Sequence, residues 1–303
     1  MRYAIFLLTL AATAHAGIVE NVRDALAQNN INLAESEVRS FKAQNGPTPE
    51  CLEALSWIGR GALAARQLDV AENYARETQA LSTQQLKTRP LDAEPHLPTA
   101  LGAAFEVEAQ VLSERGQHAQ AVALLQGALR TYRATSIRAR LQKNLNLLSL
   151  VGHPAPELGQ DRFLGAKSKS LAELRGSPVL LFFWAHWCGD CKYEGPIIRR
   201  LRLEYAAKGL TVVAPTKLYG YAGQGEDAPP QTEIAWIDRV RRQFYSGLLD
   251  VPVPISKRNF DTYGASTTPT LVLIDRKGLV DLYHPGLMSY EELRSAIDKI
   301  VAR

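Results

Sequence analysis

The sequence predicts an α-helical N-terminal domain followed by an α/β C-terminal domain with a mixed sheet. Residues 17–150 keep a helical spacing of apolar residues, residues 151–156 (VGHPAP) interrupt it, and the rest contains short continuous apolar runs typical of buried strands. A chain of 303 residues is also long enough for two domains. The predicted boundaries are therefore 1–16, 17–150 and 151–303.

Residues 1–16 are predicted to be a cleaved signal peptide. Arg2 supplies a positive start, residues 3–12 form an apolar stretch too short for a stable membrane anchor, and residues 14–16 (AHA) have the small-x-small pattern of a signal peptidase site. Gly17 would then begin the mature protein. No cysteine follows the apolar stretch, so a lipoprotein anchor is not expected. We therefore expect a periplasmic or secreted protein.

The composition excludes some classes of partner. Hydrophobic residues make up 46% and charged residues 22% of the chain, as in ordinary globular proteins. The formal net charge is +4, and the Lys and Arg residues are scattered among Asp and Glu rather than gathered in one segment. Nucleic acid is therefore not an expected partner.

The helical half contains a degenerate repeat that resembles the tetratricopeptide hairpin. The turn and the start of the second helix are suggested three times, at residues 30–34, 67–71 and 116–121. Around the third copy, Ala109, Ala121 and Ala128 fall at positions where small residues let paired helices approach closely. A Pro-containing stretch, residues 88–98, is expected to be a loop. We expect tetratricopeptide-like hairpins that bind a protein partner, with a generic helical bundle as the alternative.

The C-terminal half contains four apolar runs that we predict to be strands, at residues 179–184, 210–214, 270–275 and 279–283. Only a short turn separates the last two, which is typical of an antiparallel hairpin. Helices are expected over residues 192–207, 232–246 and 289–301, the last beginning with a capping pattern at Ser289. Alternating strands and helices that end in a hairpin indicate a mixed α/β fold.

Two of the three cysteines, Cys188 and Cys191, form a C-x-x-C motif directly after the first long strand. The following helix places Cys188 at its N-terminus, where free N–H groups and the helix dipole stabilise a thiolate. We expect Cys188 to be the exposed thiol that attacks a substrate disulfide, and Cys191 to be the more buried thiol that resolves the mixed disulfide. Cys51 is expected to be a buried helical residue that behaves as a small hydrophobe.

A lone C-x-x-C motif can also be half of a zinc site. Zinc normally takes four ligands, and this sequence has no second cysteine pair. The histidines after residue 16 are dispersed without the spacing of ligands, at His96, His118, His153, His186 and His284. We therefore expect no metal, and no cofactor beyond the Cys188–Cys191 disulfide itself.

Residues 182–196 (FFWAHWCGDCKYEGP) contain a W-C-x-x-C-x-x-E-x-P motif, which residues 170–176 precede and residues 263–278 follow. On these three stretches, residues 152–303 resemble the TlpA/ResA-type thioredoxin-like family of exported disulfide reductases. The N-terminal half lies outside it. The resemblance implies a thioredoxin-like fold, a protein disulfide as substrate, and a membrane thiol donor that keeps the cysteines reduced.

The resemblance also assigns roles to residues near the cysteines. Pro269 would be a cis-proline that faces the disulfide, and Thr268 would offer backbone atoms to an extended substrate. Glu194 would tune the pKa values of the cysteines and exchange a proton with them. The remaining substrate-binding residues would be Trp187, Gly189 and Asp190.

The sequence departs from the thioredoxin pattern in two places. Phe182 stands where typical thioredoxins carry a buried aspartate, which leaves Glu194 as the available acid. Residues 219–263 form a long extra segment that begins with a glycine-rich stretch (GYAGQG, residues 220–225). We expect this glycine-rich start to be a mobile loop near the active site that could shape substrate choice, and the helix over residues 232–246 to follow it.

The predicted function is that of an exported thiol–disulfide oxidoreductase that reduces the disulfides of partner proteins. Three alternatives are a peroxiredoxin, a copper-delivery protein and a tetratricopeptide adaptor. A peroxiredoxin would carry threonine where this chain has Ala185, and a copper-delivery protein would space its cysteines as C-x-x-x-C rather than C-x-x-C. A tetratricopeptide adaptor could use the thioredoxin-like domain as a scaffold, but both cysteines of the motif are intact.

Overall fold

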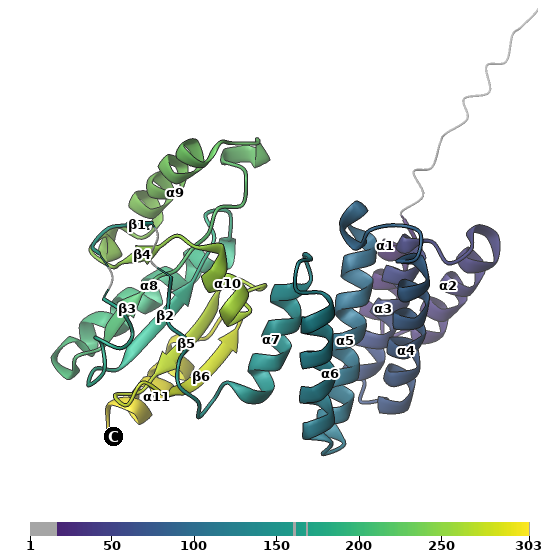
Figure 1. Ribbon diagram of the computed structural model, residues 1–303, viewed down its shortest axis with the longest axis horizontal. Helices are drawn as coiled ribbons and strands as arrows, with labels where there is room; N and C mark the ends of the chain where they lie inside the picture. The colour runs from purple at the N-terminus through teal and green to yellow at the C-terminus, as the bar shows by residue number, and fades with distance from the viewer. Residues whose placement is uncertain (1–16, 160–161, 168, 303) are drawn as a thin grey trace, which may run out of the picture. The chain divides into compact units, whose positions relative to one another are not determined.

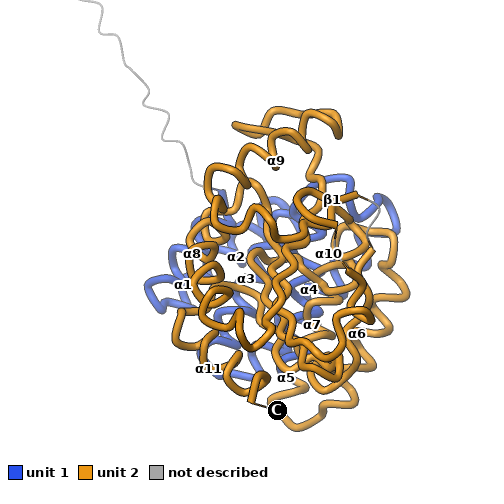
Figure 2. The backbone as a smooth tube through the Cα atoms, turned by 90° about the vertical axis from the view of Figure 1, so that its left-hand side faces the viewer, with its two compact units in different colours: residues 1–111 blue, residues 112–303 orange. Residues whose placement is uncertain are grey.

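The computed structural model describes residues 17–159, 162–167 and 169–302 (Figure 1). The chain divides into two compact units, residues 1–111 and 112–303 (Figure 2). This division falls within helix α5 (His96–Glu114), whereas the change from helices to strands follows α7 (Arg138–Ser149). The domain limits predicted at residues 16 and 150 stay predictions, and the predicted signal peptide lies outside the described residues.

The first unit is helical. Its elements are α1 (Ile18–Ala27), α2 (Ile31–Asn45), α3 (Pro49–Ala64), α4 (Leu68–Gln85), a 3₁₀ turn (Leu91–Ala93) and most of α5. Helix α1 packs against α2, and α3 packs against α4. Gly59 permits the close approach of α3 to α4, because a Cβ atom added to it would lie only 3.4 Å from Cβ of Tyr74.

The helical part of the prediction is confirmed, and the tetratricopeptide assignment stays a prediction. Helices α2, α4 and α6 (His118–Thr131) begin inside the three segments expected to start second helices. The loop expected over residues 88–98 ends earlier, because α5 begins at His96. Cys51 is fully buried within α3, as expected.

The second unit contains the end of α5, helices α6 and α7, and a four-stranded sheet in the order β3–β2–β5–β6. The strands are β2 (Val179–Phe183), β3 (Thr211–Val213), β5 (Thr270–Ile274) and β6 (Val280–Pro285). Strands β2 and β3 are parallel, and the other pairs are antiparallel. The predicted mixed sheet and closing hairpin are therefore confirmed.

Strand β2 is buried on both faces and lies between two apolar cores. Successive side chains of a strand point to opposite faces. Leu180 and Phe182 belong to one core, together with residues of α8 (Gly189–Glu204) and α11 (Tyr290–Val301). Leu181 and Phe183 belong to the other, together with residues of α10 (Lys257–Tyr263). Burial on both faces explains why this strand has an unbroken apolar sequence.

Several boundaries differ from the prediction. Helix α8 begins at Gly189 rather than residue 192, because the chain turns into a helix directly after Cys188. Within residues 219–263, the helix expected over residues 232–246 is confirmed as α9 (Pro230–Phe244), and the segment also contains β4 (Val253–Pro254) and α10. The prediction missed α10 and also the small antiparallel sheet in which β4 pairs with β1 (Phe163–Leu164).

Helix α7 packs on α10 within the second unit. The Asn146 side-chain amide donates to the carbonyl oxygen of Thr262 at 3.4 Å. Gly264 ends α10 in the left-handed conformation, with φ of +60°. A Cβ atom on Gly264 would lie 2.6 Å from the carbonyl carbon of Gln142, so glycine is what lets the two helices meet.

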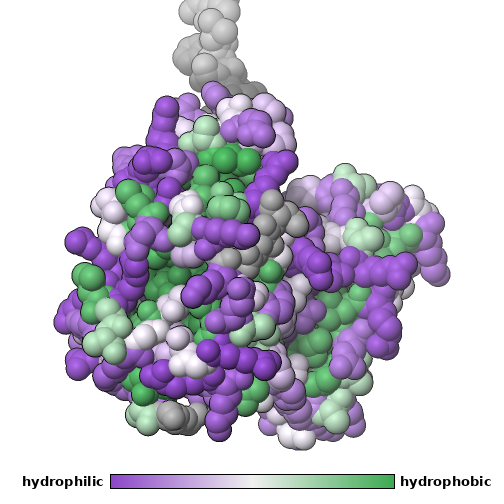
Figure 3. Space-filling model, turned by 60° about the vertical axis from the view of Figure 1, so that its left-hand side comes forward, coloured by the Kyte–Doolittle hydropathy of each residue, from purple (hydrophilic) through white to green (hydrophobic). Residues whose placement is uncertain are grey.

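On the face shown in Figure 3, hydrophilic side chains surround smaller apolar patches. Within the described part of the chain, no helix has the length and apolar character needed to cross a membrane.

Candidate functional site

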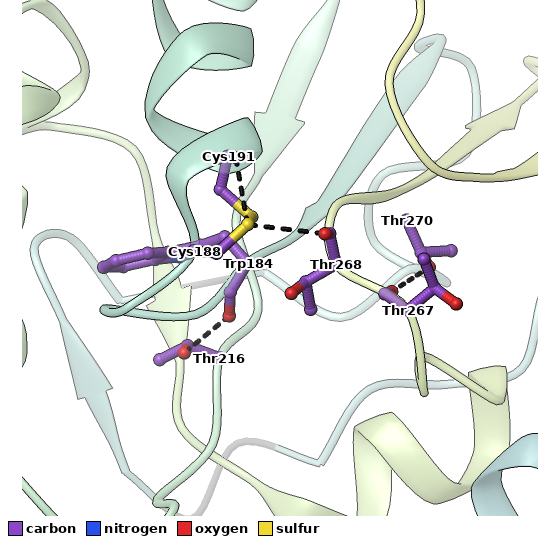
Figure 4. Close-up of a disulfide and its surroundings, with 7 residues drawn as sticks. All are labelled: Trp184, Cys188, Cys191, Thr216, Thr267, Thr268 and Thr270. Atoms are coloured by element: carbon purple, nitrogen blue, oxygen red, sulfur yellow. Dashed lines mark hydrogen bonds between the residues drawn. A yellow bond between two sulfur atoms is a disulfide. The ribbon is translucent and has the colours of Figure 1, made fainter. Parts of the chain in front are cut away.

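The site begins with the loop that leads from β2 into α8. Trp184 is buried, and its indole N–H donates to the carbonyl oxygen of Ala214 at 3.0 Å. The Thr216 hydroxyl donates in turn to the carbonyl oxygen of Trp184 at 2.8 Å (Figure 4). These bonds tie the loop to the chain that follows β3, so the residues after Trp184 are held at one end of the sheet.

Cys188 and Cys191 form a disulfide at the start of α8, with their Cα atoms 5.3 Å apart (Figure 4). Cys188 is the N-cap residue, and the backbone N–H of Cys191 donates to its Sγ at 3.0 Å. The predicted position of Cys188 at a helix N-terminus is therefore confirmed. An N–H group aimed at Sγ would also stabilise a thiolate there.

The expected exposure of Cys188 is wrong for the disulfide form. Only 3% of Cys188 is exposed, against 0% of Cys191. The cause is the opposite loop, because the carbonyl oxygen of Thr268 lies 3.4 Å from Sγ of Cys188. Cys188 is still the less buried of the two cysteines.

The loop opposite the disulfide has the geometry that the resemblance implied. The bond between Thr268 and Pro269 is cis, as predicted. The Pro269 carbonyl accepts from the N–H of Gly286 at 2.8 Å, and the Thr270 hydroxyl donates to the Thr267 carbonyl at 2.7 Å. These bonds hold the Thr268 carbonyl toward Cys188, while the Thr268 hydroxyl has no hydrogen-bond partner.

Glu194 lies fully buried in the second turn of α8. One carboxyl oxygen accepts from the backbone N–H of Met288 at 3.2 Å, and the other has no partner. Burial raises the pKa of Glu194 to about 7, and the bond from Met288 only partly opposes this effect. A carboxyl group that can hold or release a proton near neutral pH therefore lies in the helix that carries both cysteines.

Glu194→Gln should remove a pH-dependent loss of stability. The folded protein holds the Glu194 proton more tightly than the unfolded chain, whose glutamate has a pKa of 4.5. The free energy of unfolding should therefore fall as pH rises from 4.5 to about 7, by about 3 kcal/mol in total. The variant should match the wild type at pH 4 and be more stable at pH 8, as measured by urea unfolding of the oxidised protein.

Glu291→Gln is the matched control, because Glu291 is an exposed carboxylate of α11. It should keep the wild-type dependence of stability on pH. If Glu194→Gln kept that dependence as well, the raised pKa of Glu194 would be wrong.

The remaining predicted residues line the outer side of the disulfide. Gly189 and Asp190 are exposed in the first turn of α8, and Trp187 is 49% exposed just before Cys188. The Trp187 and Tyr219 rings pack edge to face, with ring centroids 5.5 Å apart. The three residues are therefore accessible from solvent next to the cysteines in sequence.

His186 and Glu233 also belong to the site, although the sequence alone did not predict them. Both are buried, and His186 Nε2 lies 3.4 Å from Oε1 of Glu233. Burial lowers the pKa of His186, and the charge of Glu233 opposes this effect. The residues are far apart in sequence, and His186 was considered only as a dispersed histidine. Its place two residues before Cys188 was the available signal.

Among the residues that the structure describes, no three His, Cys, Asp or Glu side chains gather where they could hold a metal ion. Within the part of the chain that the structure describes, the Cys188–Cys191 disulfide is a group that can be reversibly reduced.

Comparisons with known proteins agree with this geometry. Residues 166–300 match the model of the thioredoxin-like domain family. Over 148 residues the chain is 32% identical to the thioredoxin-like protein YneN of Bacillus subtilis, covering 48% of this chain and 78% of that protein.

Two further relatives are named as disulfide-exchange proteins. The thiol-disulfide oxidoreductase ResA of Bacillus thuringiensis is 30% identical over 150 residues, or 50% of this chain and 78% of that protein. The thiol:disulfide interchange protein DsbE of Xylella fastidiosa is 26% identical over 155 residues, or 51% and 71%.

Proposed function

The chain belongs to the thioredoxin-like family of thiol–disulfide oxidoreductases, and we propose on this basis that it reduces disulfides of partner proteins through Cys188 and Cys191. The observation that carries the proposal is the disulfide at the N-terminus of α8, which faces the carbonyl of Thr268. A helix N-terminus favours the thiolate on which disulfide exchange depends.

The reaction transfers two electrons. In the reduced protein, the Cys188 thiolate attacks one sulfur of the substrate disulfide, forms a mixed disulfide and releases the other sulfur as a thiolate that takes up a proton. The Cys191 thiol loses its proton, and its sulfur then attacks Sγ of Cys188. This step closes the Cys188–Cys191 disulfide and releases the second substrate thiol.

We assign supporting roles to the neighbours of the cysteines. Glu194 exchanges a proton with Cys191, a role supported by its burial and by a pKa of about 7. Thr268 and Pro269 hold an extended substrate through backbone atoms. The exposed positions of the remaining substrate-binding residues support their contact with that substrate, namely Trp187, Gly189 and Asp190.

The proposal is tested by a redox titration of the full chain and by an insulin-reduction assay with dithiothreitol as donor. We expect one two-electron couple, a potential near about −270 mV as in thioredoxin, and turnover of insulin. A potential near about −120 mV would instead identify an oxidant. A protein that left insulin disulfides intact would contradict the proposal.

We also propose that the protein is exported and that a membrane thiol donor reduces it. The support is the order of charge, apolar stretch and small residues within residues 1–16. Protein secreted from its natural host should begin at Gly17, as measured by intact mass and N-terminal sequencing. A secreted product that kept Met1 would contradict cleavage at this point.

The helical first unit is proposed to bind a protein partner. Its paired helices, α1 with α2 and α3 with α4, support a tetratricopeptide-like role, because stacked hairpins of that kind offer concave surfaces for peptides.

A further inference from the structure

A buried pair of side chains, His186 and Glu233, joins the active-site loop to the extra segment of the chain. His186 is 2% exposed and Glu233 is 0% exposed. Their closest atoms, His186 Nε2 and Glu233 Oε1, are 3.4 Å apart without the geometry of a hydrogen bond. His186 belongs to the loop before Cys188, and Glu233 lies in the first turn of α9.

Glu233 also holds the chain that precedes α9. Its two carboxyl oxygens accept from the backbone N–H groups of Tyr219 and Gly220, at 2.6 and 2.9 Å. A buried carboxyl group is costly unless it is hydrogen-bonded, so these two bonds offset part of its burial. One side chain therefore fixes both the start of the extra segment and its position against His186.

Aromatic rings fill the contact between the two segments. The Tyr219 and Tyr221 rings each pack edge to face with the His186 ring, with centroids 5.7 and 5.3 Å apart. Tyr219 also packs edge to face with Trp187, with centroids 5.5 Å apart. Edge-on aromatic pairs stabilise a defined arrangement. The half-exposed ring of Trp187, directly beside Cys188, therefore has Tyr219 as its support.

We propose that Glu233 is a positioning residue that, with His186, holds Tyr219 against Trp187. The Tyr219 and Trp187 rings then form a surface that contacts a protein substrate. We call the contact of Glu233 with His186 and with the Tyr219 backbone the latch. The inference rests on the proposed function of Cys188 and Cys191 and adds a determinant of specificity. A small disulfide needs only the sulfur of Cys188, whereas a polypeptide must also lie along the neighbouring surface.

The latch is tested with Glu233→Gln in the full chain. An amide group cannot accept from both N–H groups, because its NH₂ end is a donor. Losing one hydrogen bond to a charged group should raise KM for insulin by about tenfold and leave kcat nearly unchanged. Turnover of bis(2-hydroxyethyl) disulfide and the redox potential should stay at wild-type values.

A second variant and a direct measurement guard against misfolding. Tyr219→Ala removes the ring that supports Trp187 and leaves Glu233 intact, and it should raise KM for insulin in the same way. Hydrogen exchange of the Tyr219 and Gly220 amides should speed up by about tenfold in Glu233→Gln. Glu226→Gln is the control, since Glu226 is an exposed carboxylate of the same segment, and it should behave as the wild type.

The outcomes separate the latch from the proposed function. If wild-type protein reduces insulin but both variants keep its KM, the latch is wrong and the function stands. If both disulfides lose turnover equally in Glu233→Gln, the pair acts on the cysteines rather than on substrate choice, which also overturns the latch. If wild-type protein reduces neither disulfide, the proposed function itself fails.

Discussion

Cys191→Ser, reduced beforehand and freed of dithiothreitol, should stop at the first step of insulin reduction and stay covalently joined to its substrate. Cys188 can still attack a disulfide, but no second thiol remains to attack Sγ of Cys188 and release the product. Cys188→Ser should stop the first step as well, and turnover should fall to the rate of the buffer blank. Non-reducing gel electrophoresis should show a reducible adduct for Cys191→Ser and none for Cys188→Ser.

Cys51→Ala is the matched control, because Cys51 is the third cysteine and lies fully buried in α3. Alanine leaves no unsatisfied polar atom there, and insulin turnover should remain. If Cys191→Ser turned over insulin normally, exchange would proceed through another thiol and the assigned chemistry would be wrong.

Gly264→Ala should produce the largest loss of stability that we expect from a single added methyl group. An alanine in the left-handed conformation costs about 1–2 kcal/mol. The added Cβ would also lie 2.6 Å from the carbonyl carbon of Gln142, and relieving such overpacking costs about 1–3 kcal/mol more. Urea unfolding should show the combined loss, about 2–5 kcal/mol.

Gly209→Ala separates the two contributions. Gly209 has a similar φ of +81°, but an added Cβ would lie 4.0 Å from the Ser177 hydroxyl, at ordinary van der Waals distance. This control should lose only the conformational part, about 1–2 kcal/mol. Equal losses in the two variants would show that α7 and α10 can separate without cost.

The sheet could be predicted because its strands carry strong local patterns. Strands β2 and β5 are continuous apolar runs, and each is buried along its full length. Strands β1 and β4 could not be found in this way. Each has two residues, and they pair across a long stretch of intervening chain, so neither has a periodic pattern of its own.

The candidate site was predictable where its residues are close in sequence. Cys188, Cys191 and Glu194 fall within one motif, and the structure places all three at the start of α8. The contact between His186 and Glu233 joins residues on separate elements, brought together only when α9 packs beside the active-site loop. The near-complete burial of Cys188 depends likewise on the distant loop at Thr268.

The packing of α7 on α10 determines where the chain can be truncated when the C-terminal domain is expressed alone. An excised C-terminal polypeptide starting at residue 151 would lack α7, and the surface of α10 that this helix covers would face water. The Thr262 carbonyl would also lose the hydrogen bond that Asn146 of α7 donates. An excised polypeptide starting at Leu112 would keep α6 and α7, and we expect it to be the more stable of the two.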